Sequence, residues 1–207
     1  MLKKGFLFDL DGVLINTHKL QNKSTIKALE NYVKLNKSMI RLIDKTIPTI
    51  EKLKILNKKY FKEKKLDIYK IYQKKIKYYE AMAVKNLKQT KRLQLIFKFL
   101  KKSEFKCAVV TNSNRITAIK ILKKIHILKY LDTLVTNNDL KKLKPHPDPY
   151  NLAIYRLGGK PRNFIIIEDS PIGIESAKKT GCNYYKLKNH KDLNLKLVKL
   201  LTKKYLL

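Results

Sequence analysis

Acidic residues are scarce in this 207-residue chain, where 16 Asp and Glu stand against 48 Lys and Arg and give a formal net charge of +32. Trp is absent, and the two cysteines, Cys107 and Cys182, lack the close spacing of a metal-binding or redox motif. We therefore expect both to be buried thiols in a reducing compartment. No run of about 18 apolar residues occurs, so we predict no membrane-spanning helix and expect a cytoplasmic protein.

Arginine is also rare, which bears on what the positive charge implies. An excess of basic residues raises the hypothesis of nucleic-acid binding, because Lys and Arg neutralise phosphates. Only five of the 48 basic residues are Arg, the side chain best suited to bidentate recognition of phosphates and bases. We therefore interpret most lysines as solvated helix surface, and nucleic acid remains an alternative partner that is not favoured.

Five short apolar segments predict strands, and their lack of alternation is typical of a sheet that is buried on both faces. From the second segment onward, the strands alternate with helical patterns. One predicted helix has Asp148 as its N-cap and Gly158 as its stop, and another begins at Ser170 and ends at Gly181. This order predicts an α/β fold with a Rossmann-like, doubly wound parallel sheet. The predicted strands are 5–9, 106–111, 133–136, 163–168 and 184–187.

The stretch between the first two predicted strands has helical spacing throughout and no strand signal. We predict that residues 17–88 form a helical insertion, which leaves 1–16 and 89–207 for the α/β domain. The stripe of Ile, Tyr and Met along this insertion is interpreted as packing rather than as a ligand site. The hydrophobic content of 44% supplies enough apolar surface for a folded core.

Polar residues follow three of the predicted strands. In an open parallel sheet, ligands bind beyond the carboxyl ends of the strands, so these residues are candidates for a site. A lysine followed by proline, in a loop that leads into a helix, joins them. The candidates are Asp9, Asp11, Thr111, Asn112, Lys144, Glu168 and Asp169.

Four carboxylates in this set cannot all stay ionised by themselves, because like charges at close range raise each other's pKa. A divalent cation resolves the repulsion, and hard oxygen ligands favour Mg²⁺. Gly12 allows a tight turn and the close approach of a phosphoryl group. A carboxylate beside a cation, a second acid two residues later, a hydroxyl group and a lysine fit phosphoryl transfer through an aspartyl-phosphate.

Four segments resemble, in order and spacing, the motifs of the haloacid dehalogenase-like (HAD) superfamily: FDLDGVL, VVTNSN, KPHPDPY and IIIEDSPIGIESAKKTG. More narrowly, they are similar to its phosphatase and β-phosphoglucomutase branch, in which a helical cap follows the first strand. The resemblance covers residues 5–17 and roughly 103–187. It implies a HAD-like core with an inserted all-helical cap at 17–88, and a Mg²⁺-dependent phosphoric monoester hydrolase that acts on a small phosphorylated metabolite.

The resemblance also implies roles for the two acids of the first motif. Asp9 would be the nucleophile and a Mg²⁺ ligand. Asp11 would protonate the leaving group, then activate water, and contribute its backbone carbonyl to the metal. Dehalogenases of the superfamily lack an acid at this second position, so Asp11 favours phosphoryl chemistry.

The remaining candidates receive binding roles from the same resemblance. Thr111, with Asn112 beside it, and Lys144 would hold the transferring phosphoryl group. Asp169 would ligate the metal, and Glu168 would support the metal directly or through water.

Two alternatives remain open at this point. The first is a β-phosphoglucomutase-like sugar-phosphate mutase of the same branch, which is weakened because no Arg stands near Pro48, where the mutases have one. The second is a basic module on the same fold that binds nucleic acid or acidic partners through its lysines. The identity of the substrate is not given by the sequence.

Overall fold

The computed structural model describes residues 3–45, 47–62 and 65–207. The chain forms two compact units. One comprises Met1–Asn16 with Leu87–Leu207, and the other comprises Thr17–Asn86. Within the described ranges, no helix combines the length and the apolar character that a membrane span requires.

The first unit contains a five-stranded sheet with the order β3-β2-β1-β4-β5, and all neighbouring strands are parallel. The predicted α/β fold with a doubly wound parallel sheet is confirmed. Each strand end lies within one residue of its predicted position. The strands are β1 (Gly5–Phe8), β2 (Lys106–Val110), β3 (Thr133–Val135), β4 (Phe164–Glu168) and β5 (Asn183–Lys186).

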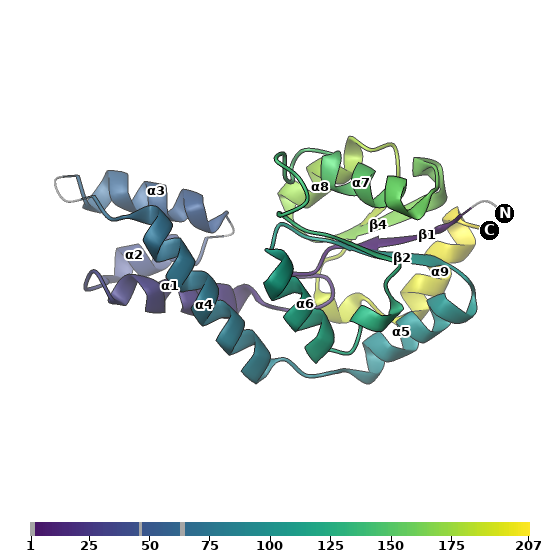
Figure 1. The fold of residues 1–207 in the computed structure, drawn as a ribbon, viewed down its shortest axis with the longest axis horizontal. Coiled ribbons are helices and arrows are strands. Elements are labelled where there is room, and N and C mark those ends of the chain that lie inside the picture. Colours follow the sequence, from purple (N-terminus) through teal and green to yellow (C-terminus); the bar gives the residue numbers. More distant parts are fainter. Residues whose placement is uncertain (1–2, 46, 63–64) are drawn as a thin grey trace. The chain divides into compact units, whose positions relative to one another are not determined.

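Helices cover both faces of this sheet (Figure 1). One face carries α5 (Lys91–Lys102), α6 (Arg115–Lys124) and α9 (Leu195–Tyr205). The opposite face carries α7 (Asp148–Leu157) and α8 (Pro171–Lys178). Three short 3-10 helices complete the unit: η1 (Leu128–Tyr130), η2 (Pro161–Asn163) and η3 (His190–Asp192).

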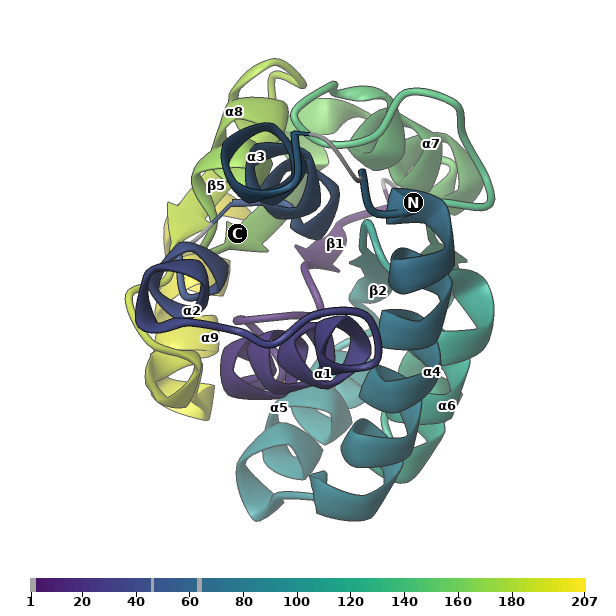
Figure 2. The same cartoon turned by 90° about the vertical axis from the view of Figure 1, so that its left-hand side faces the viewer.

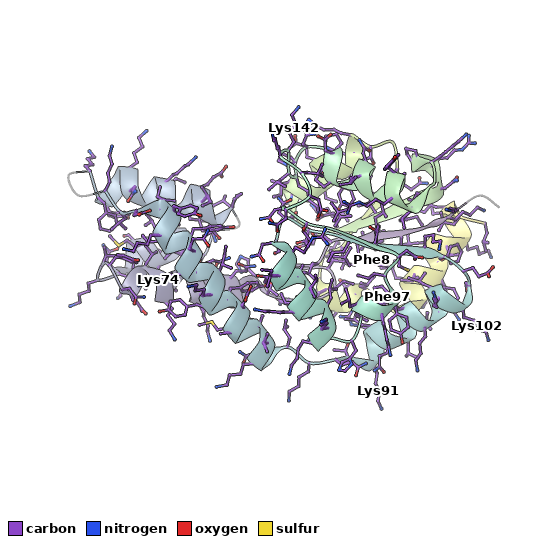
Figure 3. All side chains as sticks on the ribbon, in the orientation of Figure 1. Phe8, Lys74, Lys91, Phe97, Lys102 and Lys142 are labelled. Atoms are coloured by element: carbon purple, nitrogen blue, oxygen red, sulfur yellow. The ribbon has the colours of Figure 1, made fainter. Side chains whose placement is uncertain are left out.

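The two helical layers explain why the central strand is apolar throughout. Successive side chains of β1 point to opposite faces, and every residue of β1 is buried. Leu7 packs in the cluster that contains residues of α7, whereas the ring of Phe8 lies 5.3 Å from that of Phe97 in α5 (Figure 3). The exposed side chains of Lys91 and Lys102 extend away from the ribbon in the same view.

Two helix ends differ from the sequence prediction. Asp148 is the first residue of α7 rather than its N-cap, which is Pro147, while Gly158 ends the helix as predicted and adopts a left-handed conformation. Helix α8 begins at the predicted Ser170 cap but ends at Lys178, before Gly181. At this end, the carbonyl of Ala177 accepts from both the backbone N–H and the hydroxyl of Thr180, at 3.1 and 2.7 Å, so its bonds go to a tight turn rather than to a continued helix.

The regular structure in the described part of the second unit consists of helices joined by loops: α1 (His18–Glu30), α2 (Lys37–Ile43), α3 (Thr49–Tyr60) and α4 (Ile68–Asn86). Figure 2 shows these helices in purple to blue. Leu29 of α1, Leu53 of α3 and Ile71 of α4 belong to one apolar cluster. Ile71 and Tyr79, from the stripe of Ile, Tyr and Met, are buried, which agrees with a packing role.

A buried lysine also ties these helices together. Lys52 of α3 is 5% exposed, and its Nζ donates to the carbonyl of Ile43 at 2.6 Å and to Oδ1 of Asn22 at 3.1 Å. The amide of Asn22 donates in turn to Asp44 at 3.0 Å. Burial lowers the pKa of Lys52, and the charge of Asp44 opposes this effect only in part. The ammonium group therefore joins α1, the end of α2 and α3 through uncharged acceptors.

Candidate functional site

The order of the strands brings three chain segments to one edge of the sheet. In β1, Phe8 pairs with Val109 of β2 on one side and with Ile167 of β4 on the other. Asp9 is the next residue, and its backbone N–H donates to the carbonyl of Ile167 at 3.0 Å. Its side chain is therefore placed between the polar residues that follow β2 and those at the end of β4.

Lys144 connects these segments. Its Nζ donates to Oδ1 of Asp9 at 2.7 Å, to Oε1 of Glu168 at 2.6 Å and to the carbonyl of Val110 at 2.8 Å. An ammonium group has three hydrogens, so each of them has an acceptor. Burial alone would lower the pKa of Lys144, but the carboxylates of Asp9 and Glu168 outweigh it and raise that pKa. Lys144 is therefore a fixed positive charge between two acids.

Glu168 is fully buried, and both of its carboxylate oxygens accept hydrogen bonds. Oε1 accepts from Lys144 and from the hydroxyl of Tyr150, the latter at 2.8 Å. Oε2 accepts from the backbone N–H groups of Asp169 and Ser170 at 3.1 and 3.3 Å and from the Ser170 hydroxyl at 3.2 Å. These contacts fix the orientation of the carboxylate.

Asp169 provides the test of whether the site fits a metal ion. Its Oδ1 is buried and has no hydrogen-bond partner among the described residues. One carboxylate oxygen from each of Asp9, Glu168 and Asp169 lies within 4.8 Å of the others. Gly12 has φ +95, and a Cβ there would lie 2.1 Å from Oδ2 of Asp169, so only glycine leaves room for this carboxylate. Three oxygen donors with an unpartnered atom among them fit a hard cation such as Mg²⁺.

The acids of this cluster destabilise each other's charge. Burial raises the pKa of Asp9 well above its usual range, Lys144 opposes this, and the charges of Glu168 and Asp11 add to it. Burial, reinforced by Glu168, raises the pKa of Asp169 to about 6. A divalent cation would lower both pKa values, since its charge favours the ionised carboxylates.

A serine connects the second acid to the second strand. The hydroxyl of Ser113 donates to Oδ2 of Asp11 at 3.0 Å, and the backbone N–H of Ser113 donates to Oγ1 of Thr111 at 3.1 Å. Thr111 is buried and its own N–H donates to the carbonyl of Val135 at 2.9 Å. Asn112 exchanges two hydrogen bonds of 3.2 Å with the backbone of Lys144. The segment after β2 therefore fixes both Asp11 and the lysine loop.

The residues named from sequence thus form two connected groups. Asp9, Lys144 and Glu168 are in direct contact, and Asp169 completes their cluster. Asp11 and Thr111 are joined through Ser113 rather than through the lysine ammonium, and Asn112 contacts the lysine backbone.

Sequence reasoning missed Ser113 and Tyr150. Ser113 stands two residues after Thr111, a spacing that could have signalled it. Tyr150 lies on the apolar face of a predicted helix, and nothing in the sequence marks its hydroxyl.

An ion-pair hub holds the start of the loop that carries Lys144. The carboxylate of Asp139 accepts two hydrogen bonds from Arg115, at 2.6 and 2.8 Å, and one from Arg156 at 2.8 Å. It also accepts from the N–H and the hydroxyl of Thr136, each at 2.8 Å. Partial burial would raise the pKa of Asp139, but the bonds from Arg156 and Thr136 and the charge of Arg115 lower it to about 2. The loop is therefore anchored to α6 and α7.

Comparison with known proteins shows which family and which relatives the whole chain resembles. The family model described as haloacid dehalogenase-like hydrolase matches residues 6–186. A phosphorylated carbohydrates phosphatase of Thermotoga maritima is 28% identical over 177 residues, which is 84% of this chain and 80% of that protein. The pyrophosphatase PpaX of Halalkalibacterium halodurans is 30% identical over 178 residues, covering 84% of this chain and 79% of the relative.

Solved structures share the fold over nearly the whole chain. A HAD hydrolase of Entamoeba histolytica matches with a TM-score of 0.79 and 20% identity, covering 97% of this chain and 99% of that one. The β-phosphoglucomutase of Clostridium difficile matches with a TM-score of 0.75 and 20% identity over 99% of both chains. At this level of identity, the likeness supports the architecture alone.

Proposed function

The chain belongs to the haloacid dehalogenase-like hydrolase family, and we propose that it is a Mg²⁺-dependent phosphatase that hydrolyses a small phosphorylated metabolite through an aspartyl-phosphate on Asp9. The observation that carries the proposal is the contact of Lys144 with both Asp9 and Glu168, beside the unpartnered oxygen of Asp169. The names of the two relatives, a phosphatase of phosphorylated carbohydrates and a pyrophosphatase, support the same chemistry.

In the first step, a carboxylate oxygen of Asp9 attacks phosphorus, and the bond from phosphorus to the leaving oxygen breaks. Asp11 gives its proton to that oxygen, and the Ser113 hydroxyl orients Asp11 for this transfer. In the second step, Asp11 takes a proton from water, and the water oxygen attacks the phosphorus of the aspartyl-phosphate. Inorganic phosphate leaves and the Asp9 carboxylate is restored.

Asp9 and Asp169, with the backbone carbonyl of Asp11, are the proposed ligands of Mg²⁺, and Glu168 is proposed to support the metal directly or through water. When bound, Mg²⁺ supplies positive charge that neutralises the phosphoryl oxygens. Lys144 adds a second positive charge that is already fixed beside Asp9.

The segment after β2 is proposed to bind the phosphoryl group. The hydroxyl of Thr111 and the neighbouring Asn112 would hold its oxygens. The side-chain amide of Asn112 also holds the backbone of Lys144, so this residue contributes by fixing the lysine as well. We further propose that residues 1–16 and 89–207 form the catalytic core and that the helical region 17–88 is a cap that excludes water during transfer.

The test is a panel of phosphomonoesters and pyrophosphate, assayed for phosphate release with Mg²⁺ and with EDTA. The wild type should release phosphate from at least one compound, EDTA should abolish the release, and Asp9→Asn should be inactive but folded. Asp148→Asn is the matched control, because this carboxylate is 40% exposed and lies outside the cluster. No release from any compound by the folded wild type with Mg²⁺ would refute the proposal.

A further inference from the structure

Tyr150 carries a hydroxyl group where packing alone needs only an aromatic ring. It lies in the first turn of α7, is fully buried, and belongs to the same apolar cluster as Leu7 and Val110 of the sheet. A buried hydroxyl costs free energy unless it is hydrogen-bonded. Its partner is Oε1 of Glu168, which accepts the bond at 2.8 Å. The hydroxyl therefore donates its hydrogen bond to a carboxylate of the candidate site.

The hydrogen bond from Tyr150 is one of only two that Oε1 of Glu168 accepts among the described residues. Oε2 of Glu168 is held by backbone and side-chain donors at the start of α8, whereas Oε1 accepts from Lys144 and Tyr150. The first turn of α8 closes over the carboxylate so tightly that a Cβ on Gly173 would lie 1.9 Å from Oε1. Removal of the tyrosine hydroxyl would leave Oε1 with Lys144 as its described donor.

Tyr150 also touches the lysine itself. The centroid of its ring lies 4.7 Å from Nζ of Lys144, a distance at which an ammonium group is attracted to the face of an aromatic ring. The same residue therefore contacts a carboxylate through its hydroxyl and an ammonium through its ring. The position of that ammonium matters, since its remaining hydrogens go to Asp9 and to the carbonyl of Val110.

We propose that Tyr150 is a positioning residue of the phosphoryl-transfer site. It holds the Glu168 carboxylate and the Lys144 ammonium in position beside Asp9. The proposal rests on the proposed function for its catalytic consequence. Its geometric part, the support of the carboxylate cluster from α7, stands on the contacts alone. Without the hydroxyl, Oε1 loses one of its two donors, so the position of the oxygen that holds Lys144 beside Asp9 is less constrained.

The variant Tyr150→Phe keeps the ring and removes only the hydroxyl. Loss of a group that orients a metal ligand typically costs about 10–100-fold in activity or metal affinity. We expect kcat for p-nitrophenyl phosphate to fall by about 10–100-fold while KM changes by less than about twofold, and the Kd of Mg²⁺, measured by calorimetry, to rise by about tenfold. Tyr130→Phe is the control, because its ring packs 6.1 Å from that of Phe97.

A double-mutant cycle separates positioning from general loss of structure. In a Glu168→Gln background, Tyr150→Phe should change the Kd of Mg²⁺ much less than it does in the wild type, because the hydroxyl acts through Glu168. The proposal would be overturned if Tyr150→Phe changed the Kd of Mg²⁺ equally in both backgrounds. It would also be overturned if the kcat and Kd of Tyr150→Phe lay within about twofold of the wild-type values. If the wild type hydrolyses no phosphomonoester, the proposed function fails, and the calorimetric cycle still decides the role of Tyr150.

Discussion

The two units of the chain each bury a lysine, and the surroundings shift the pKa values of these two lysines in opposite directions. Lys144 of the first unit is 6% exposed and contacts two carboxylates, which raise its pKa. Lys52 of the second unit is 5% exposed and contacts an amide and a backbone carbonyl, and burial lowers its pKa. In a chain with only 16 acids, four of them lie in the segments that surround Lys144.

Under the proposed function, the difference distinguishes a lysine that takes part in phosphoryl transfer from one that connects helices. Paired carboxylates around Lys144 keep it ionised and keep a positive charge beside the proposed nucleophile. Neutral acceptors around Lys52 take two of its hydrogens and join three helices, and no carboxylate accepts from it directly among its described hydrogen bonds. The predictions below test this contrast, from the largest expected effect to the smallest.

Lys144→Met should have the largest effect. Removing one partner of a buried ion pair leaves its carboxylates uncompensated, which typically costs about 3–5 kcal/mol of unfolding free energy. Turnover should fall by about a thousandfold or more, as for other groups that stabilise transferring charge. Urea denaturation and phosphate release measure the two effects. A variant with wild-type turnover would show that this lysine is structural, like Lys52.

Mg²⁺ should stabilise the protein in a pH-dependent way. The pKa of Asp169 is raised in the folded state to about 6, so its ionisation destabilises the folded protein as pH rises from about 4 through 6, and a bound cation relieves this. At about 100-fold excess over Kd, binding adds about 2.7 kcal/mol. Thermal unfolding at pH 7.5 and pH 5, each with Mg²⁺ or EDTA, should show the larger shift at pH 7.5. An equal shift at both values would contradict the proposed ligand.

Asp139→Asn tests the hub that anchors the Lys144 loop. Because the folded-state pKa of Asp139 lies at about 2, below the usual value of 3.8, the ionised carboxylate contributes about 2 kcal/mol above pH 4. That contribution is lost as pH falls from about 4 toward 2. The difference in unfolding free energy between wild type and variant should therefore be largest at pH 7 and shrink at pH 3. A constant difference would mean that the charge of Asp139 is not its source.

Lys52→Met should have the smallest effect. The variant leaves the carbonyl of Ile43 and the amide oxygen of Asn22 without their donor, but it also removes the cost of burying the ammonium. We expect a loss of about 1 kcal/mol, within the range for unsatisfied buried groups. Chemical denaturation measures it beside Lys144→Met. A larger loss than that of Lys144→Met would reverse the contrast between the two units.

The sheet could be predicted from the sequence, because short apolar segments of strand length that alternate with capped helices allow few topologies. The same topology explains why residues that follow β1, β2 and β4 meet at one edge. The roles of Ser113 and Tyr150 could not be read from sequence, since each depends on which hydroxyl lies near which carboxylate. The burial of Lys52 was equally hidden, because one lysine among many carries no local signal. Helix α8 ends at Lys178 rather than at Gly181, in a turn where the carbonyl of Ala177 accepts from both the backbone N–H and the hydroxyl of Thr180.

The proposed path of the phosphoryl group through Asp9 can be tested most directly by trapping it. Asp11→Asn should slow attack by water, while p-nitrophenyl phosphate needs no proton donor for its leaving group, so the aspartyl-phosphate should accumulate in this variant. Acid quench followed by mass spectrometry of Asp11→Asn should find one phosphoryl group on the peptide that carries Asp9. The double variant Asp9→Asn/Asp11→Asn should carry none. Release of p-nitrophenol without a phosphoryl group on this peptide, or with the phosphoryl group on another residue, would contradict the account.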